Sequence, residues 1–171
     1  MSDFDWVLEI LLKKHERSTF DCGESELNQY LKKFARQNIE KNLSKTFVAI
    51  VPPNKIIGFY SISAGSVGFE TLPQELYKKL PKYPIPIVRL SRLAVDKTVQ
   101  GKGLGEGLLM DAFQRCVNFS KEIGVFGLIV DAKHEKAKKF YLQYGFHELT
   151  NQPLTLFIPT KTIKAMMVEN G

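Results

Sequence analysis

The sequence predicts one α/β (α+β) domain built around a mixed β-sheet, and three observations lead to that prediction. The first half of the chain contains two β-rich segments joined by a proline turn, which is typical of an antiparallel hairpin. The second half alternates strand and helix patterns, which is typical of strands connected by helices. The 171 residues, 44% of them hydrophobic, match a single domain with its own core, expected over residues 1–171.

The first half is expected to begin with a strand over 6–12, followed by one long amphipathic helix within 18–43. A Gly-Glu-Ser signal indicates the helix start, and helical spacing indicates its apolar face, formed by Leu27, Tyr30, Leu31, Phe34 and Asn38. Two strands follow within 45–63, on either side of a turn that contains two prolines and an asparagine.

The middle of the chain is expected to form a surface excursion with a short helix over 74–80, which leads to a strand over 87–95. This strand is mostly apolar but contains Arg89, Ser91 and Arg92, so it lacks the simple alternation of a two-faced strand. A cation on a central strand is costly unless it meets an anion or a buried partner. The arginine pair therefore indicates a binding site or an internal salt bridge.

The second half contains a helix predicted by an apolar stripe of Leu104, Leu108, Leu109, Ala112, Phe113 and Cys116. A buried strand over 124–132, a helix over 134–146 that stops at Gly145, and a last strand over 154–160 complete the expected order.

Composition narrows the class of protein. Two cysteines, Cys22 and Cys116, are too few for a disulfide framework or a four-ligand zinc site, so we expect no metal and a reducing cytoplasm. The N-terminal apolar stretch is short and interrupted by charges, which predicts neither a signal peptide nor a membrane span. The net charge of +6 and the pI of about 9.2 are compatible with an anionic partner, although charge alone favours a solvated surface.

The stretch QGKGLG, residues 100–105, joins the arginine-containing strand to the following helix. Its spacing matches neither the nucleotide P-loop nor the G-x-G-x-x-G pattern. Gly103 and Gly105 remove side chains in front of a helix start whose N–H groups are unpaired, an arrangement that binds an anion such as a pyrophosphate. A plain tight turn is the alternative. Gly107 argues mildly for close packing or approach, because glycine inside a helix costs about 1 kcal/mol relative to alanine.

Two motifs resemble the GNAT superfamily of acetyl-CoA-dependent N-acetyltransferases. QGKGLG resembles its Q/R-x-x-G-x-G/A pyrophosphate loop, and KAKKFYLQYGF, residues 136–146, resembles its A-x-x-F-Y-x-x-x-G-F segment. More narrowly, TFDCGESELNQYLKKFARQN, RLSRLAVDKTVQGKGLG and VDAKHEKAKKFY resemble the GNAT toxins of bacterial toxin–antitoxin systems, which acetylate the amino group of aminoacyl-tRNA and so block translation.

The resemblance implies a fold, a co-substrate and partners. The implied fold is a mixed, mostly antiparallel sheet of about six to seven strands flanked by helices, with a V-shaped splay between the two middle strands. The implied co-substrate is acetyl-CoA, and the implied partners are aminoacyl-tRNA, a small ribbon-helix-helix antitoxin and a second copy of the chain, with no membrane involved.

The resemblance also implies the donor site. The main chain of Leu93, Ala94 and Val95 would hold the pantetheine arm, and the N–H of Val95 is the candidate for the oxyanion. The pyrophosphate would be held by the backbone of the loop, formed by Gln100, Gly101, Lys102, Gly103, Leu104 and Gly105. Lys102 adds a charge contact to a phosphate or is simply solvent-exposed.

Two further side chains follow from the second motif. Tyr141 matches the family tyrosine near the sulfur, so it is the candidate acid for the departing thiolate, and packing beside Phe140 and Tyr144 is the alternative. Many superfamily members have asparagine where this chain has His134. That histidine would replace a contact to CoA, act as a base through water, or cap the helix.

The sequence gives less direct evidence for the amine that accepts the acetyl group. No dedicated base is evident, and an α-amino group titrates near 7.7 to 8.0 whereas a lysine titrates near 10.4, so an α-amine needs less help to react. The candidate cations for tRNA are Arg92, Arg89, Lys32, Lys33, Arg36, Lys136, Lys138 and Lys139, with Arg92 the first choice. The alternatives are a GNAT that acetylates a protein N-terminus, a lysine or a small amine, and a non-catalytic CoA-binding or antitoxin-binding module.

Overall fold

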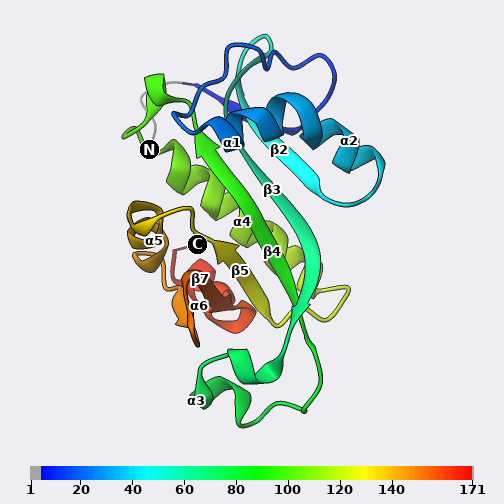
Figure 1. Cartoon of the computed structure of the whole chain (residues 1–171), viewed down its shortest axis with the longest axis vertical. Helices are drawn as coiled ribbons and strands as arrows, with labels where there is room; N and C mark the ends of the chain where they lie inside the picture. Colours follow the sequence, from blue (N-terminus) through cyan, green and yellow to red (C-terminus); the bar gives the residue numbers. More distant parts are fainter. Residues whose placement is uncertain (1–4, 171) are drawn as a thin grey trace. The chain divides into compact units, whose positions relative to one another are not determined.

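Seven strands form one mixed sheet in the order β1-β2-β3-β4-β5-β7-β6 (Figure 1). The strands are β1 (Val7–Ile10), β2 (Lys45–Val51), β3 (Lys55–Val67), β4 (Ile85–Val95), β5 (Gly127–Asp131), β6 (His147–Leu149) and β7 (Gln152–Pro159). β4 and β5 are parallel, and the β1–β2, β2–β3, β5–β7 and β6–β7 ladders are antiparallel. The predicted mixed, mostly antiparallel sheet is therefore confirmed.

The computed structural model describes residues 5–170, so residues 1–4 of the predicted N-terminal stretch and residue 171 lie outside the described residues. The chain divides into two compact units, residues 1–63 with 91–112 and residues 64–90 with 113–171. Strands β3 and β4 and helix α4 (Leu104–Ser120) contribute residues to both units. The expectation of a single domain over residues 1–171 stays a prediction.

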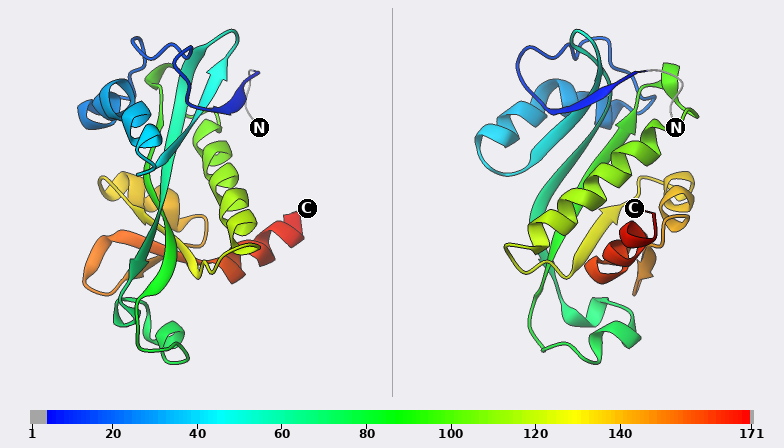
Figure 2. Two further views of the ribbon diagram at one scale, coloured as in Figure 1. Left: turned by 90° about the vertical axis from the view of Figure 1, so that its right-hand side faces the viewer. Right: turned by 180° about the vertical axis from the view of Figure 1, so that it is seen from behind.

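In the first unit, three consecutive helical segments lie on one face of β2 and β3, and the first turns of α4 lie on the other face (Figure 2). The segments are α1 (Ser25–Gln29), the π-helical turn η1 (Tyr30–Phe34) and α2 (Ala35–Glu40). Beneath them lies a core of fully or almost fully buried side chains, namely Leu11, Phe20, Leu27, Tyr30, Leu31, Ala35, Val48, Ile50, Ile56, Phe59 and Ala94.

The π-helical turn corrects one prediction. A π turn closes i→i+5 hydrogen bonds and takes up one residue more than an α turn, so the side chains after it lie on different faces from those that uninterrupted α spacing predicts. Ala35 is fully buried, whereas Phe34 is 51% exposed. The predicted single α-helix with Phe34 on its apolar face is therefore wrong at this turn, and Leu27, Tyr30 and Leu31 are buried as predicted.

Two glycines allow α4 and its neighbours in the first unit to pack closely. A Cβ atom at Gly107 would lie 2.9 Å from the ring of Trp6, and one at Gly58 would lie 3.1 Å from Leu104 Cδ2. The close packing that Gly107 indicated is therefore confirmed, with Trp6 as the neighbour. The apolar stripe predicted for α4 is buried at all six of its positions, Leu104, Leu108, Leu109, Ala112, Phe113 and Cys116.

The second unit contains the β4–β5 ladder, the strands β6 and β7, and four short helical elements. These elements are the 3₁₀ turn η2 (Phe69–Thr71), α3 (Gln74–Tyr77), α5 (Glu135–Leu142) and α6 (Thr160–Asn170). Its core contains Leu72, Ile85, Ile87, Ile129, Leu149 and Phe157. Strand β6 and helix α6 were not predicted, and the helix expected over 74–80 ends at Tyr77.

Among residues 5–170, no helix is long and apolar enough to cross a membrane.

Candidate active site

The loop between β4 and α4 has the backbone geometry that its glycines predicted. Asp96 starts the 3₁₀ turn η3 (Lys97–Val99), and its carboxylate accepts hydrogen bonds from the N–H and the hydroxyl of Thr98 at 3.0 and 2.7 Å. Gly101 and Gly103 then adopt φ angles of +77° and +87°, in the left-handed region that favours glycine. Helix α4 begins at Leu104, and the first N–H groups of a helix have no intrahelical partner. The loop therefore presents an exposed helix N-terminus suited to an anion.

The Gln100 side chain holds this loop to the rest of the first unit. Its Nε2 donates hydrogen bonds to the backbone carbonyls of Cys22, at 3.1 Å, and Val95, at 2.9 Å. The predicted role of Gln100 in holding the pyrophosphate therefore falls to its backbone N–H, because both side-chain amide hydrogens are used by the protein.

Two aspartates that the sequence analysis missed connect the loop to the segment before α1. Asp96 is 5% exposed, and its Oδ2 accepts a hydrogen bond from the N–H of Asp21 at 3.0 Å. The carboxylate of Asp21 forms an ion pair with Lys97 at 3.0 Å. The N–H of Gly23, the Asn28 amide and the Lys97 charge lower the pKa of Asp21 to about 2. Asp96, one residue past the strand and two before Thr98, had the spacing of an Asx turn, which is the signal that could have found it.

The last residues of β4 lie beyond its pairing with β5. The β4–β5 register runs from Ile87 opposite Gly127 to Leu90 opposite Val130. Residues 91–95 continue β4 past this ladder, and they include the predicted pantetheine-binding positions Leu93, Ala94 and Val95. Ala94 is buried in the first unit's core, and Leu93 and Val95 are half-buried. Strand residues outside a ladder have main-chain groups that an extended ligand can pair with.

Tyr141 lies on α5 in the second unit. It is 5% exposed, and burial raises the pKa of its hydroxyl. Its ring makes edge-to-face contacts with Phe140 and Phe146, at centroid distances of 5.2 and 5.5 Å. No group within residues 5–170 forms a hydrogen bond with this hydroxyl, and no side-chain oxygen or nitrogen there is both fully enclosed and unpaired. The Tyr141 ring is therefore packed among aromatic side chains, and its hydroxyl has no hydrogen-bond partner within the described residues.

His134 caps α5. Its Nδ1 accepts a hydrogen bond from the N–H of Ala137 at 3.2 Å, which realises the capping alternative. This bond uses Nδ1 as the acceptor and holds the imidazole at the start of α5.

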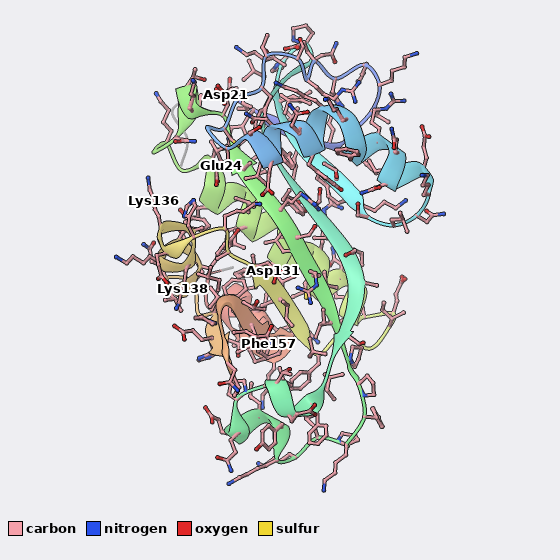
Figure 3. All side chains as sticks on the ribbon, viewed as in Figure 1. Asp21, Glu24, Asp131, Lys136, Lys138 and Phe157 are labelled. Atoms are coloured by element: carbon pink, nitrogen blue, oxygen red, sulfur yellow. The ribbon has the colours of Figure 1, made fainter. Side chains whose placement is uncertain are left out.

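The other basic residues predicted to bind tRNA fall into two groups. Some are held by carboxylates: Arg89 by Asp131 at 2.6 Å, Lys138 by Glu148 at 2.5 Å, and Arg36 by Glu40 at 3.8 Å. The Lys138 side chain is 11% exposed, and its hydrogen bond to Glu148 raises its pKa. Lys33, Lys136 and Lys139 are exposed and Lys32 is half-buried, with Lys136 and Lys138 both on α5 (Figure 3).

Arg92 has a different partner. Its guanidinium carbon lies 3.7 Å from the centroid of the Tyr30 ring, the distance of a cation–π contact. No carboxylate within residues 5–170 forms an ion pair with Arg92. The internal salt bridge considered for Arg92 is therefore not formed in the described part of the chain.

A glycine-bearing loop at an open helix N-terminus, following a strand that extends past its ladder with β5, suits a ligand with a pyrophosphate and an extended arm, as acetyltransferases that use an acyl-CoA require. The chain belongs to the GNAT acetyltransferase family, because residues 17–155 match the model of the "Acetyltransferase (GNAT) domain". The predicted family is thus confirmed.

Particular members of this family resemble the whole chain. A "tRNA-acetylating toxin" of Mycobacterium tuberculosis is 37% identical over 150 residues, which cover 88% of this chain and 89% of the relative. The solved structure of AtaT complexed with acetyl-methionyl-tRNAfMet has a TM-score of 0.89 and 31% identity, covering 95% of this chain and 99% of the other. A tyrosine-to-phenylalanine variant of AtaT, bound to the C-terminus of the antitoxin AtaR and to acetyl-CoA, has a TM-score of 0.82 and 28% identity, covering 96% and 99%.

Proposed function

We propose that this chain is a toxin that transfers the acetyl group of acetyl-CoA to the α-amino group of an aminoacyl-tRNA. The observation that supports this best is the 37% identity to a tRNA-acetylating toxin over nearly the full length of both chains. The donor loop and Tyr141 supply the groups that such a transfer needs. We also propose that the two units work as one acetyltransferase domain and that the protein acts in the cytoplasm, where charged tRNA is found.

The donor binds along the first unit in this proposal. The N–H groups from Gln100 to Gly105 and the positive end of the α4 dipole hold the pyrophosphate. The exposed Lys102 adds a charge to this contact. The main chain of Leu93, Ala94 and Val95 pairs with the pantetheine arm, and the Val95 N–H stabilises the charge that develops on the thioester oxygen.

Acetyl-CoA supplies an activated acyl carbon, and Tyr141 handles the proton. As the C–N bond forms and the C–S bond breaks, the Tyr141 hydroxyl protonates the sulfur. Burial raises the pKa of Tyr141, so the hydroxyl stays protonated at neutral pH but forms a tyrosinate only at a high cost. We therefore propose that the proton lost to sulfur is replaced by one from the attacking nitrogen.

The acceptor fits an α-amine better than a lysine. No carboxylate within residues 5–170 forms a hydrogen bond with the Tyr141 hydroxyl, so none there is placed to take a proton directly from it. An α-amino group, with a pKa of about 7.7–8.0, is already partly neutral at cellular pH, whereas a lysine at about 10.4 is not.

The direct test incubates the protein with labelled acetyl-CoA and total charged tRNA, and then identifies the aminoacyl group that carries the label. We expect Tyr141→Phe to bind acetyl-CoA normally and to lose most turnover, whereas the matched variant Tyr144→Phe keeps it. Label found in proteins or small amines but in no aminoacyl-tRNA would overturn the acceptor, and full turnover by Tyr141→Phe would overturn the acid role.

The tRNA-binding cations have an internal control on α5. Lys136 and Lys139 are exposed, and Lys138 is paired with Glu148. Each lost phosphate contact should reduce the slope of log affinity against log salt by about 0.7–0.9. We expect this reduction for Lys136→Met and Lys139→Met but not for Lys138→Met, measured with charged tRNA by filter binding. A wild-type slope in all three variants would exclude α5 from the tRNA surface, and an equal reduction in all three would contradict the expected difference between Lys138 and the two exposed lysines.

The partners follow from the same proposal. We propose that a small ribbon-helix-helix antitoxin neutralises this chain and that the chain pairs with a second copy. Expression should arrest growth, and both Tyr141→Phe and the neighbouring antitoxin gene should relieve the arrest. Arrest that persists with Tyr141→Phe would indicate a mechanism other than acetylation.

A further inference from the structure

Arg92 and Tyr30 form a contact that leaves the hydrogen-bonding groups of the arginine available. The Arg92 guanidinium lies over the face of the Tyr30 ring at 3.7 Å, and no ion pair within the described residues 5–170 uses its N–H groups. A guanidinium is planar, so stacking uses its face while its five N–H donors point outward around its edge. The edge of Arg92 therefore keeps the fork that binds a phosphate in bidentate fashion.

Tyr30 is a rigid support for this arginine. Its side chain is 4% exposed, and its hydroxyl forms hydrogen bonds with Ser44 Oγ at 3.0 Å and Asn38 Nδ2 at 3.3 Å. The Tyr30 ring also stacks against Phe59 of β3 at a centroid distance of 6.5 Å. Burial raises the pKa of Tyr30, yet hydrogen bonds to its hydroxyl and the charge of Arg92 leave it below its ordinary value. Because Phe59 and the hydrogen bonds to the hydroxyl hold the Tyr30 ring in place, the ring does not move with the Arg92 side chain. The contact therefore restricts the position of the Arg92 guanidinium.

The place of Arg92 on β4 indicates which part of the reaction it serves. Alternate residues of a strand share a face, so Arg92 and Ala94 lie on the same face of β4. Ala94 belongs to the hydrophobic core that also contains Tyr30. Leu93, the first position proposed to pair with the pantetheine arm, is the next residue along. A phosphate bound at Arg92 would lie close to the proposed pantetheine-binding residues, so the end of the tRNA that carries the amino acid is the part expected to reach it.

We propose that Tyr30 is a positioning residue, which holds Arg92 so that the edge of its guanidinium binds a phosphate at the 3′ end of the charged tRNA. This inference rests on the proposed function. It assigns Tyr30 a role that neither motif predicts, and it explains why an arginine rather than a lysine suits position 92. A lysine ammonium can lie over the ring, but it lacks the two parallel N–H donors by which a guanidinium binds two oxygens of one phosphate.

The test measures KM for charged tRNA and KM for acetyl-CoA in five variants: Tyr30→Phe, Tyr30→Leu, Arg92→Lys, Arg92→Met and the double variant Tyr30→Leu/Arg92→Met. Tyr30→Phe keeps the ring and should raise KM for charged tRNA by no more than about twofold. Tyr30→Leu removes the ring and should raise it about three- to tenfold, the range expected for a lost cation–π contact. KM for acetyl-CoA should stay within about twofold in both, because no contact with the donor changes.

The double variant separates positioning from general support of the fold. If Tyr30 acts through Arg92, Tyr30→Leu should have no further effect on tRNA affinity once Arg92→Met is present. Arg92→Met should also reduce the salt slope of charged-tRNA binding by about 0.7–0.9, and Arg92→Lys should lose affinity while keeping the charge. Arg92→Lys leaves the buried Tyr30 in place, so it tests the fork even if Tyr30→Leu does not fold.

Three outcomes would overturn the inference. Tyr30→Leu could raise both KM values equally, its effect could persist unchanged in the Arg92→Met background, or Arg92→Lys could match the wild type. A wild-type protein that acetylates charged tRNA with any of these results refutes the role of Tyr30 alone. A wild-type protein that neither binds nor acetylates charged tRNA refutes the proposed function as well.

Discussion

Asp96→Asn should destabilise the protein, because it replaces one acceptor of a buried turn by a donor. Asp96 is 5% exposed, with Oδ1 accepting two hydrogen bonds from Thr98 and Oδ2 accepting one from the Asp21 N–H at 3.0 Å. The carboxamide oxygen of an asparagine can keep both bonds to Thr98, but its NH₂ group then faces the Asp21 N–H. Losing a hydrogen bond to a charged acceptor and leaving a buried donor unpaired should lower the free energy of unfolding by about 2–3 kcal/mol.

Urea denaturation followed by the fluorescence of Trp6, the one tryptophan in the sequence, measures this loss. The comparison variant is Asp21→Asn, whose side chain is 43% exposed, so water can replace part of what its carboxylate loses and we expect a smaller loss. Hydrogen bonds lower the pKa of Asp96 although burial alone raises it, so its contribution is present above the ordinary aspartate pKa of about 3.9 and is lost as the pH falls further. The gap between wild type and Asp96→Asn should therefore shrink below about pH 4. A loss at pH 7 of less than about 0.5 kcal/mol would refute the reasoning.

Three other predictions use the same preparations. Gly107→Val places a Cβ 2.9 Å from the Trp6 ring, so it should lower the unfolding free energy by about 1–3 kcal/mol and shift the Trp6 emission; an unchanged spectrum would contradict this packing. Phe34 is half exposed, so Phe34→Glu should change the unfolding free energy by less than about 0.5 kcal/mol. Leu31 is fully buried, so Leu31→Ala should lower the unfolding free energy by about 2–5 kcal/mol. Equal losses in the two variants would contradict the register set by the π turn. Because burial raises the pKa of Tyr141, kcat at saturating substrates should show no loss from tyrosine ionisation below about pH 10.

The sequence predicted elements whose local pattern is strong. The hairpin, the long strand β4, the glycine loop and the buried stripe of α4 all follow from short-range periodicity and turn residues, and the structure confirms them. Strand β6 has three residues, too few to show alternation, and on α6 only Ile163 is fully buried among the residues up to 168. Neither element had a periodic signal to detect.

The π turn at Tyr30–Phe34 shows a second limit. Helical periodicity assumes one register, and a single additional residue changes which side chains face the sheet after it. Phe34 is the more hydrophobic choice for a buried face, yet the smaller Ala35 occupies it. Nothing in the local sequence marks the shift, which depends on how the helix packs against β2 and β3.

Contacts between residues far apart in the chain were the least predictable part of the candidate site. Asp21 is 75 residues from Asp96, and Tyr30 is distant in sequence from Arg92, so no spacing rule connects either pair. Lys138 lies on the same helix as the exposed Lys136, but its partner Glu148 comes from β6, an element that was not predicted. The main-chain positions of the donor loop were easier to predict, because the family motif fixes them together.

The amide of Gln100 gives a physical reason for the first letter of the Q/R-x-x-G-x-G/A motif. One nitrogen serves two carbonyl oxygens, those of Cys22 and Val95, and this requires a long side chain with at least two N–H bonds and no negative charge. Glutamine and arginine both meet that requirement, whereas glutamate has no hydrogen to donate and methionine forms no such bond. Either residue at this position would then keep the side-chain hydrogen bonds that connect the loop to the segment before α1, and neither side chain would be needed for contact with the co-substrate.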